Sequence, residues 1–291
     1  MQAEMDLVEV LVPTPLHCDV ACAVLEAGYH VNLQKPIART MDEVDRILAV
    51  RNKSGATLRI MEDYLFFEPL VRLKEITESG EIGRPAGLHM KMVATGRGAW
   101  DISPSSWAWQ LQQMRDGLPL LMFDDGWHKF AVAHWLFGPI NLVWAWAGRS
   151  QLDDDYSIGA PTTVVWEHTN GLRGVLDITV APEMYFRSDY YGGDERVEVT
   201  GTKGFARVNR ISAHGIQEPP LVVYRDGEMR GYHALGDDPV SAFRASCDHM
   251  LRYLRTGDGE IRLNGDQSRD VLAFVLAAME SSRTRVPVQL V

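Results

Sequence analysis

The chain has 291 residues, of which 46% are hydrophobic and 23% are charged, and its formal net charge at pH 7 is −10. This length suggests one large domain or two moderate ones with a sizeable core. The acidic balance and the lack of a basic stripe in the sequence argue against a nucleic-acid-binding protein. We see no apolar run long enough for a transmembrane helix, and the three cysteines cannot form a disulfide framework, which predicts a reducing, cytoplasmic compartment.

The first 36 residues read as strand, turn, helix and strand. Residues 8–12 are apolar and mostly β-branched, as in a strand that is buried on both faces. A helix is predicted over residues 16–27 and a second strand over residues 30–33. Ligands bind outside the carboxyl ends of parallel strands, so we expect Pro13-Thr14 and Gln34-Lys35 to face one cleft.

Further helix and strand signals continue this pattern. Thr40 is the predicted N-cap of a helix over residues 41–52, and Glu43 completes a capping box. A third strand is predicted at residues 56–61 and a third helix at residues 69–79. Residues 6–80 therefore read as β-α-β-α-β-α, which implies parallel strands and right-handed crossovers.

The hydrophobic period changes after Gly83, where we place the boundary between a domain over residues 1–83 and a domain over residues 84–291. The second domain begins with a predicted strand at residues 87–95. Residues 96–117 are rich in Gly, Ser, Pro and Trp, which predicts a long loop over a site. A helix is expected over residues 117–136.

The remaining elements are mostly strands. They are predicted at residues 142–147, 162–168, 174–180, 196–200, 205–209 and 221–224, followed by helices at 240–255 and 264–284 and a last strand at 286–291. The expected fold class is α/β plus α+β: a partial Rossmann-like parallel sheet, then a domain with an open, mainly antiparallel sheet.

Three residues are candidates for catalysis. Lys35 follows a strand and precedes a proline, which would direct its ammonium into the cleft, although most lysines are solvated surface charges. Asp124 and His128 are four residues apart and share a helix face. A carboxylate beside an imidazole can orient it and raise its basicity. A capping Asp and a core His account for the same spacing.

Other polar and aromatic residues are less specific. His17 opens the first helix and is either a ligand-site residue or an ordinary first-turn histidine. Trp107 is a candidate platform for the C–H face of a sugar, and packing explains it equally well. Cys18 and Cys22 are read as core thiols and Asp153-Asp154-Asp155 as a solvated turn, so we predict no metal site.

Five segments carry a family pattern in one order. They are VPTPLH at 12–17, AVLEAGYHVNLQKP at 23–36, SGEIGRP at 79–85, DDGWHKFAVAHWLFG at 124–138 and VEVTGTKGFARV at 197–208. Together they resemble the glucose–fructose oxidoreductase, inositol dehydrogenase and MocA family of sugar dehydrogenases over nearly the whole chain. The resemblance implies a Rossmann domain and then an α+β domain whose open sheet packs on another subunit, giving a homo-oligomer.

The resemblance also implies a reaction. The substrate would be a sugar or polyol, and hydride would pass from its carbinol carbon to NAD or NADP. Lys35 or His128 would accept the hydroxyl proton, while Asp124 would orient His128 or bind the sugar. The residues implied to hold the cofactor are Pro13, Thr14, His17, Gln34 and Lys35. The substrate contacts are Lys35, Trp107, Asp124 and His128.

Several features depart from the family pattern. No G-x-G-x-x-G turn or ribose-binding acid precedes residues 8–12, so roughly 60 residues are expected to be missing in front through a late start codon or a shortened chain. Gln34 replaces an acid, which would leave Lys35 without a neighbouring carboxylate. Ala131 stands where an Asp is usual, and MEDYLFFEP at 61–69 differs from the usual N-x-R-F-x-P.

Two other functions stay open. Lys35, Asp124 and His128 could abstract a proton next to a carbonyl, as in a cofactor-independent sugar lyase or hydratase. The chain could also be a non-catalytic partner subunit that covers another chain with its open sheet.

Overall fold

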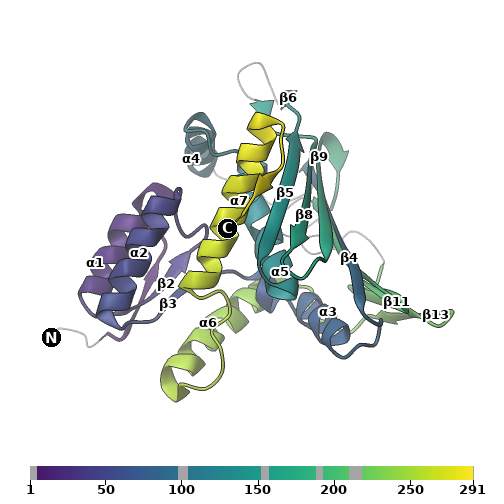
Figure 1. The fold of residues 1–291 in the computed structure, drawn as a ribbon, viewed down its shortest axis with the longest axis horizontal. Helices are drawn as coiled ribbons and strands as arrows, with labels where there is room; N and C mark the ends of the chain where they lie inside the picture. Colours follow the sequence, from purple (N-terminus) through teal and green to yellow (C-terminus); the bar gives the residue numbers. More distant parts are fainter. Residues whose placement is uncertain (1–4, 98–103, 152–156, 188–192, 210–217, 291) are drawn as a thin grey trace.

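The computed structural model describes residues 5–97, 104–151, 157–187, 193–209 and 218–290 (Figure 1). Two sheets organise these residues, one of three strands and one of nine. Asp153-Asp154-Asp155 lie outside the described residues. In the described ranges no helix is both long enough and apolar enough to cross a bilayer.

The small sheet contains β1 (Leu7–Val10), β2 (His30–Gln34) and β3 (Leu58–Met61), which are parallel and lie side by side in that order. Helices α1 (His17–Glu26) and α2 (Met41–Ser54) form its outer layer (Figure 1). Their buried faces pack against fully buried strand residues, so the apolar period sets the layering. The predicted parallel β-α-β-α-β unit is confirmed.

Local capping is partly as predicted. The Thr40 hydroxyl accepts the backbone N–H of Glu43 at 3.2 Å, which confirms the N-cap of α2. The Glu43 carboxylate instead accepts the backbone N–H of Arg39 at 2.8 Å and its guanidinium at 2.7 Å. The cation therefore draws the carboxylate one residue away from the position that a capping box requires.

The large sheet is antiparallel apart from the parallel pair of β4 and β9, which confirms the mainly antiparallel prediction. Its spatial order is β13-β12-β11-β10-β4-β9-β8-β5-β14. The bounds are β4 Pro85–Arg97, β5 Ile140–Ala147, β8 Thr162–His168, β9 Arg173–Tyr185, β10 Gly193–Gly201, β11 Gly204–Asn209, β12 Leu221–Arg225, β13 Glu228–Tyr232 and β14 Val288–Gln289. A separate short hairpin pairs β6 (Ser150–Gln151) with β7 (Ser157–Ile158).

The covering helices are α3 (Glu68–Glu78), α5 (Asp125–Phe137), α6 (Pro239–Thr256) and α7 (Gly265–Thr284). Helix α7 runs between the two sheets (Figure 1) and packs with α5 through Phe130 and Phe274, whose ring centroids are 4.4 Å apart. Helix α6 reaches the small sheet. The boundary that we predict at residue 83 stays a prediction.

The loop prediction for residues 96–117 is wrong in its second half. Helix α4 spans Pro104–Arg115. Proline suits the first turn of a helix because its missing N–H has no partner there, and residues 104–115 contain no glycine. Two of the three glycines in residues 96–117, Gly96 and Gly98, precede Pro104, where the helix begins.

The helix predicted over residues 117–136 is divided. Leu120–Asp124 form a π-helical turn, and α5 begins at Asp125. Gly126 admits this wide turn, because a Cβ there would lie only 3.0 Å from the Leu121 carbonyl oxygen. Such turns occur often at functional sites.

Candidate active site

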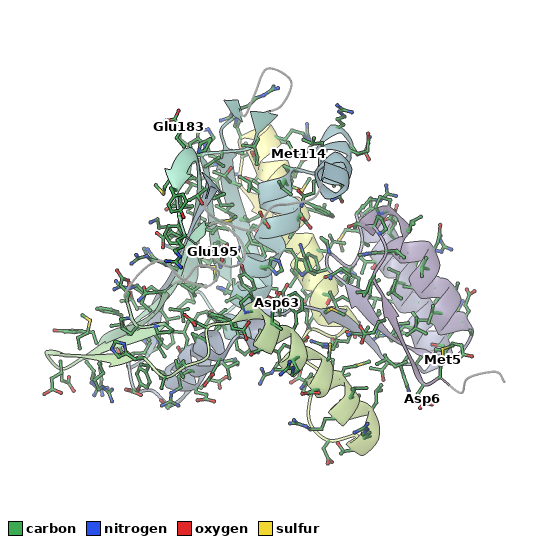
Figure 2. All side chains as sticks on the ribbon, turned by 180° about the vertical axis from the view of Figure 1, so that it is seen from behind. Met5, Asp6, Asp63, Met114, Glu183 and Glu195 are labelled. Atoms are coloured by element: carbon green, nitrogen blue, oxygen red, sulfur yellow. The ribbon has the colours of Figure 1, made fainter. Side chains whose placement is uncertain are left out.

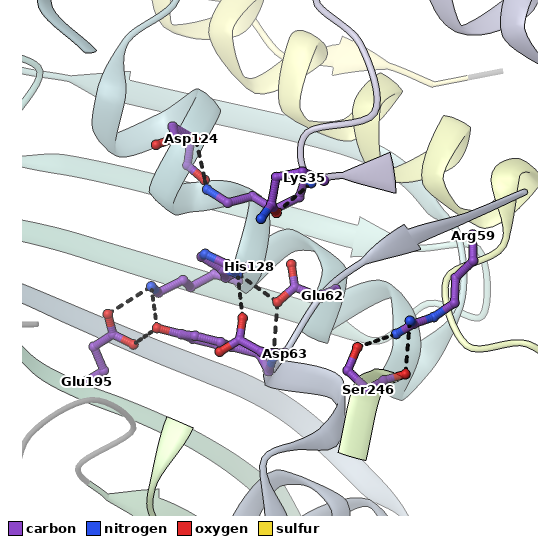
Figure 3. Close-up of polar contacts among 11 residues, drawn as sticks. Lys35, Arg59, Glu62, Asp63, Asp124, His128, Glu195 and Ser246 are labelled. Carbon is purple, nitrogen blue, oxygen red and sulfur yellow. Dashed lines mark hydrogen bonds and ion pairs between the residues drawn. The ribbon is translucent and has the colours of Figure 1, made fainter. Parts of the chain in front are cut away.

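The candidate site lies where β2 and β3 end. Because the two strands are parallel, the residues after each strand meet at one edge of the sheet. Lys35 follows β2, and Glu62 and Asp63 follow β3. The π-helical turn and the first turn of α5 bring Asp124 and His128 to the same place (Figure 3). In the view from behind, Asp63 lies near the centre of the molecule (Figure 2).

Lys35 is held by Asp124. Its Nζ donates to Asp124 Oδ1 at 2.7 Å and to the Asp124 carbonyl oxygen at 3.1 Å. Burial lowers the pKa of Lys35, but the carboxylates of Asp124 and Asp125 outweigh it and leave this pKa raised. The expectation that Lys35 lacks a carboxylate is therefore wrong. Its partner comes from a position 89 residues away, and Gln34 Oε1 accepts only the Lys35 backbone N–H at 2.8 Å.

His128 is held by Glu62. The His128 Nδ1 lies 2.6 Å from Glu62 Oε1 and 3.8 Å from Asp63 Oδ1. The Asp124 carboxylate is turned to Lys35 instead, so the structure does not give Asp124 the orienting role toward His128 that the spacing suggested. The π-helical turn before α5 accounts for this, because it breaks the regular helical register that the spacing argument assumed.

A second layer lies behind the imidazole. The rings of Tyr64 and His128 stack with centroids 4.4 Å apart and planes 15° apart. The Tyr64 hydroxyl donates to Glu195 Oε2 at 2.9 Å, and Lys129 Nζ donates to Glu195 Oε1 at 2.8 Å. Burial and the Glu195 carboxylate raise the pKa of Tyr64 well above its usual range, so it remains a neutral donor.

Glu62, Asp63 and His128 together offer donor atoms within 4.8 Å of one another. Two carboxylates and an imidazole are ligands that a divalent cation accepts. The 2.6 Å separation of His128 Nδ1 and Glu62 Oε1 is nevertheless that of a hydrogen bond. Ligand atoms about 2.0 Å from a tetrahedral metal lie about 3.3 Å apart. The geometry therefore fits a shared proton better than a shared metal.

Asp63 holds its proton more strongly than an ordinary aspartate does. Burial raises the pKa of Asp63 to about 6, with a further increase from Glu62 and an opposing effect of His128. Its side chain is nine-tenths buried.

The predicted cofactor residues lie at the end of β1 and beside it. Pro13 is exposed, and Thr14 is buried in the 3₁₀ turn Thr14–Leu16. The His17 ring nitrogens lie 2.7 Å from the Pro36 carbonyl oxygen and 2.9 Å from that of Val12. Burial lowers the pKa of His17 against the effect of these carbonyls. His17 thus links the ends of β1 and β2, and its role toward a cofactor stays a prediction.

Other sequence predictions have mixed outcomes. Cys18 and Cys22 are buried free thiols, which confirms them as core residues. Trp107 lies in α4, but its side chain is outside the described residues. Glu62 and Asp63 were missed as site residues. The rule that selected Lys35, a polar residue directly after a buried parallel strand, would also have selected them.

Comparisons with known proteins agree with this architecture. A family model described as "Oxidoreductase family, NAD-binding Rossmann fold" matches residues 1–62, and one described as "GFO/IDH/MocA C-terminal domain" matches residues 70–207. The chain is 30% identical to the uncharacterized oxidoreductase YrbE of Bacillus subtilis over 207 residues, 70% of this chain and 55% of that protein. It is 26% identical to inositol 2-dehydrogenase of Salmonella typhimurium over 217 residues, 74% of this chain and 58% of that enzyme.

The chain thus matches little more than half the length of these two relatives. Among solved structures, an oxidoreductase from Agrobacterium radiobacter in complex with NAD+, L-tartaric acid and magnesium shares the fold. Its TM-score is 0.81 at 18% identity, covering 99% of this chain and 80% of that one.

Proposed function

The chain belongs to the GFO/IDH/MocA family of oxidoreductases, and from this premise we propose that it oxidises a sugar or polyol with NAD or NADP. The observation that carries the proposal is the convergence of Lys35, Asp124 and His128 at the carboxyl ends of the parallel strands. A partly buried ammonium and a partly buried imidazole are the groups that a carbinol hydroxyl needs.

We place the dinucleotide at the edge of the small sheet where β1 and β2 end. The ends of β1 and β2 lie next to each other there, with Pro13 exposed and Lys35 charged. We propose Pro13, Thr14, Gln34 and Lys35 as the residues that hold the cofactor, with His17 fixing the two strand ends behind them. When bound, the nicotinamide supplies the acceptor for the hydride.

The residues of the chain handle the hydroxyl. Lys35 is oriented by Asp124 and donates a hydrogen bond to the substrate oxygen, which stabilises negative charge as it develops. His128 is fixed by Glu62 and is available to accept the proton. The buried layer of Tyr64, Lys129 and Glu195 keeps the imidazole in one orientation.

We also propose a homo-oligomer through the nine-stranded sheet. The indoles of Trp144 and Trp146 on β5 are 49% and 62% exposed, and apolar surface of this kind marks an interface. Sedimentation of the wild-type chain and of a Trp144→Ser/Trp146→Ser variant tests it, since the variant should be monomeric.

The cytoplasm is the compartment we propose, because Cys18 and Cys22 are free thiols.

The test of the main proposal is titration of the purified chain with NADH and NADPH, followed by nicotinamide fluorescence. We expect micromolar binding of at least one, and then reduction of the oxidised form in the presence of a sugar or polyol from a panel. Sugar turnover without any cofactor would instead establish a lyase or hydratase. A folded chain that binds neither form and turns over no sugar would contradict the proposal.

A further inference from the structure

His128 meets a pair of adjacent carboxylates. The ring presents Nδ1 to Glu62 Oε1 at 2.6 Å, and the same oxygen accepts the backbone N–H of Tyr64 at 3.1 Å. An ionised carboxylate only accepts hydrogen bonds, so Nδ1 carries a proton in this arrangement. In neutral imidazole the other nitrogen, Nε2, is then an acceptor.

The position of Glu62 is fixed. Its side chain is fully buried, and Oε1 accepts the backbone N–H of Tyr64 in addition to its contact with the imidazole. The Tyr64 ring stacks on His128 and is itself anchored through Glu195. The imidazole is therefore restrained both in its plane and across its face.

The charges around the imidazole divide into pairs. The titratable groups that face it are Lys35 after β2, Glu62, Asp63 and Tyr64 after β3, Asp124, Asp125 and Lys129 on or beside α5, and Glu195 on β10. Lys35 is paired with Asp124, and Lys129 with Glu195. In the described part of the chain, neither Glu62 nor Asp63 forms an ion pair with a lysine or arginine, and both approach His128 Nδ1, at 2.6 and 3.8 Å.

We propose that Glu62 is a positioning residue that keeps the proton of His128 on Nδ1 and leaves Nε2 free, so that His128, and not Lys35, accepts the substrate proton. This inference rests on the proposed function and adds to it a residue and a division of labour. Lys35 is already engaged by two oxygens of Asp124 and carries a raised pKa, which suits a donor to the substrate oxygen better than a base.

The proposed oxidation combines a proton transfer to His128 with a hydride transfer to the cofactor. The O–H bond of the substrate breaks and an Nε2–H bond forms, which makes His128 an imidazolium that shares its Nδ1 proton with the Glu62 carboxylate. The C–H bond breaks with its electron pair, which passes as hydride to the oxidised nicotinamide cofactor. The O–H electrons form the second bond of the carbonyl. Glu62 stabilises the imidazolium without being protonated itself, as a carboxylate does in a catalytic triad.

The decisive substitution is Glu62→Met. It keeps roughly the same length but removes Oε1, the atom that holds the Nδ1 proton of His128, and it removes the charge that stabilises the imidazolium. Removing the charge of the orienting carboxylate in a serine protease triad lowers kcat about 10⁴-fold. We expect a loss in kcat of about 10³-fold with KM within about threefold. Glu228→Met, the same change on exposed β13, is the matched control.

A second readout does not depend on activity. In ¹⁵N-histidine NMR the neutral tautomers are distinguishable, and we expect Nδ1–H for His128 in the wild type and in Glu228→Met, but Nε2–H in Glu62→Met, where no carboxylate holds the Nδ1 proton. His128→Asn identifies the signal. A wild type with Nε2–H, or a Glu62→Met variant with an unchanged tautomer, would overturn the inference even if the enzyme is active.

The two readouts separate this inference from the proposed function. If the wild type is inactive but His128 shows the expected tautomers, the proposed function is contradicted and the positioning of His128 by Glu62 remains supported. An active wild type whose Glu62→Met variant changes tautomer but keeps its kcat would show that Lys35 is the base. Stoichiometric binding of Zn²⁺ that displaces the Nδ1 proton and increases turnover would also overturn the inference, because the three side chains would then be metal ligands.

Discussion

Two polar clusters use the same strands of the small sheet in opposite ways. The first is the active-site cluster, defined as Lys35, Glu62, Asp63, Asp124 and His128. The second, which we call the strand row, is Glu9, Asn32, Arg59 and Ser246 (Figure 3 shows Arg59 and Ser246). Glu9, Asn32 and Arg59 lie opposite one another on β1, β2 and β3, within the strands and not after them.

The strand row is saturated. Asn32 donates to both Glu9 oxygens at 2.8 and 3.0 Å, and Arg59 donates to Asn32 Oδ1 at 3.3 Å and to Ser246 Oγ at 2.6 Å. Arg59 is completely buried, and this burial lowers its pKa to about 10, so it stays charged at neutral pH. The row ties β3 to α6 and leaves no group of Arg59 for a ligand.

The active-site cluster is not saturated. The side chains of Lys35 and His128 keep 16% and 14% of their exposure, and Glu62 Oε2 has no hydrogen-bond partner among the described residues. The polar groups within the strands are thus engaged in hydrogen bonds that stabilise the fold, whereas those directly after the strands remain available for chemistry. This difference predicts which substitutions affect turnover and which affect stability.

The largest expected effect is on turnover. Lys35→Met should lower kcat/KM at least about 10³-fold, because it removes the cation that stabilises charge on the substrate oxygen. Steady-state kinetics of the cofactor-dependent reaction measure it. Lys53→Met on exposed α2 is the control and should behave as wild type. Equal turnover of both variants would remove Lys35 from the mechanism.

Arg59→Met should act on stability instead. It leaves buried acceptors of Asn32 and Ser246 without their partner, at about 1–3 kcal/mol for each group, so we expect a total cost of about 3–5 kcal/mol and a decrease in Tm of roughly 10 °C. Calorimetry measures the shift, and turnover per folded molecule at low temperature should stay within about twofold of wild type. A strong loss of turnover with an unchanged Tm would contradict the division between the clusters.

Asp63→Asn should stabilise the chain in a pH-dependent manner. The folded pKa of Asp63 is about 6, above its ordinary value of 3.8, so the folded state binds more protons and wild-type stability falls as the pH rises through this interval. The amide has no such loss. We expect Asp63→Asn to be about 2 kcal/mol more stable than wild type near pH 7.5 and nearly equal to it near pH 4. Thermal melts at both pH values decide the sign, and a variant that is less stable near pH 7.5 would refute the assignment.

The smallest effect is expected at the exposed end of the strand row. Glu9→Gln retains an acceptor for Asn32 and changes a charge at an exposed site, so the free energy of unfolding should change by less than about 0.5 kcal/mol. Urea denaturation measures it beside Arg59→Met. If Glu9→Gln lowered the free energy of unfolding as much as Arg59→Met does, the exposed Glu9 and not the buried Arg59 would be the main stabilising residue of the strand row.

Sequence patterns predicted the parts of the fold that depend on local periodicity. The parallel unit over β1–β3 and most strands of the large sheet were predicted, because apolar alternation and glycine breaks mark them directly. The parallel pairing of β4 with β9 and the ion pair of Lys35 with Asp124 were among the features that escaped. Both are set by how distant segments pack, and no spacing along the chain encodes that.

The sequence predicted several residues of the site correctly, but it did not predict which of their side chains contact one another. The strand-end rule indicated Lys35, and the helix motif indicated Asp124 and His128, but regular helical geometry paired the last two wrongly. Glu62 and Asp63 were seen as a departure from a family pattern and not as chemistry. A rule based on strand ends alone would have treated 34–35 and 62–63 alike.

The π-helical turn at Leu120–Asp124 has a consequence for the history of this sequence. A π turn holds one residue more than an α turn, and each residue rotates a helix by about 100°. Loss of one codon between Pro119 and Asp124 would restore a regular helix and rotate the preceding side chains away from their neighbours. The active site therefore depends on the length of this stretch, so insertions and deletions should be depleted here even where one apolar residue replaces another.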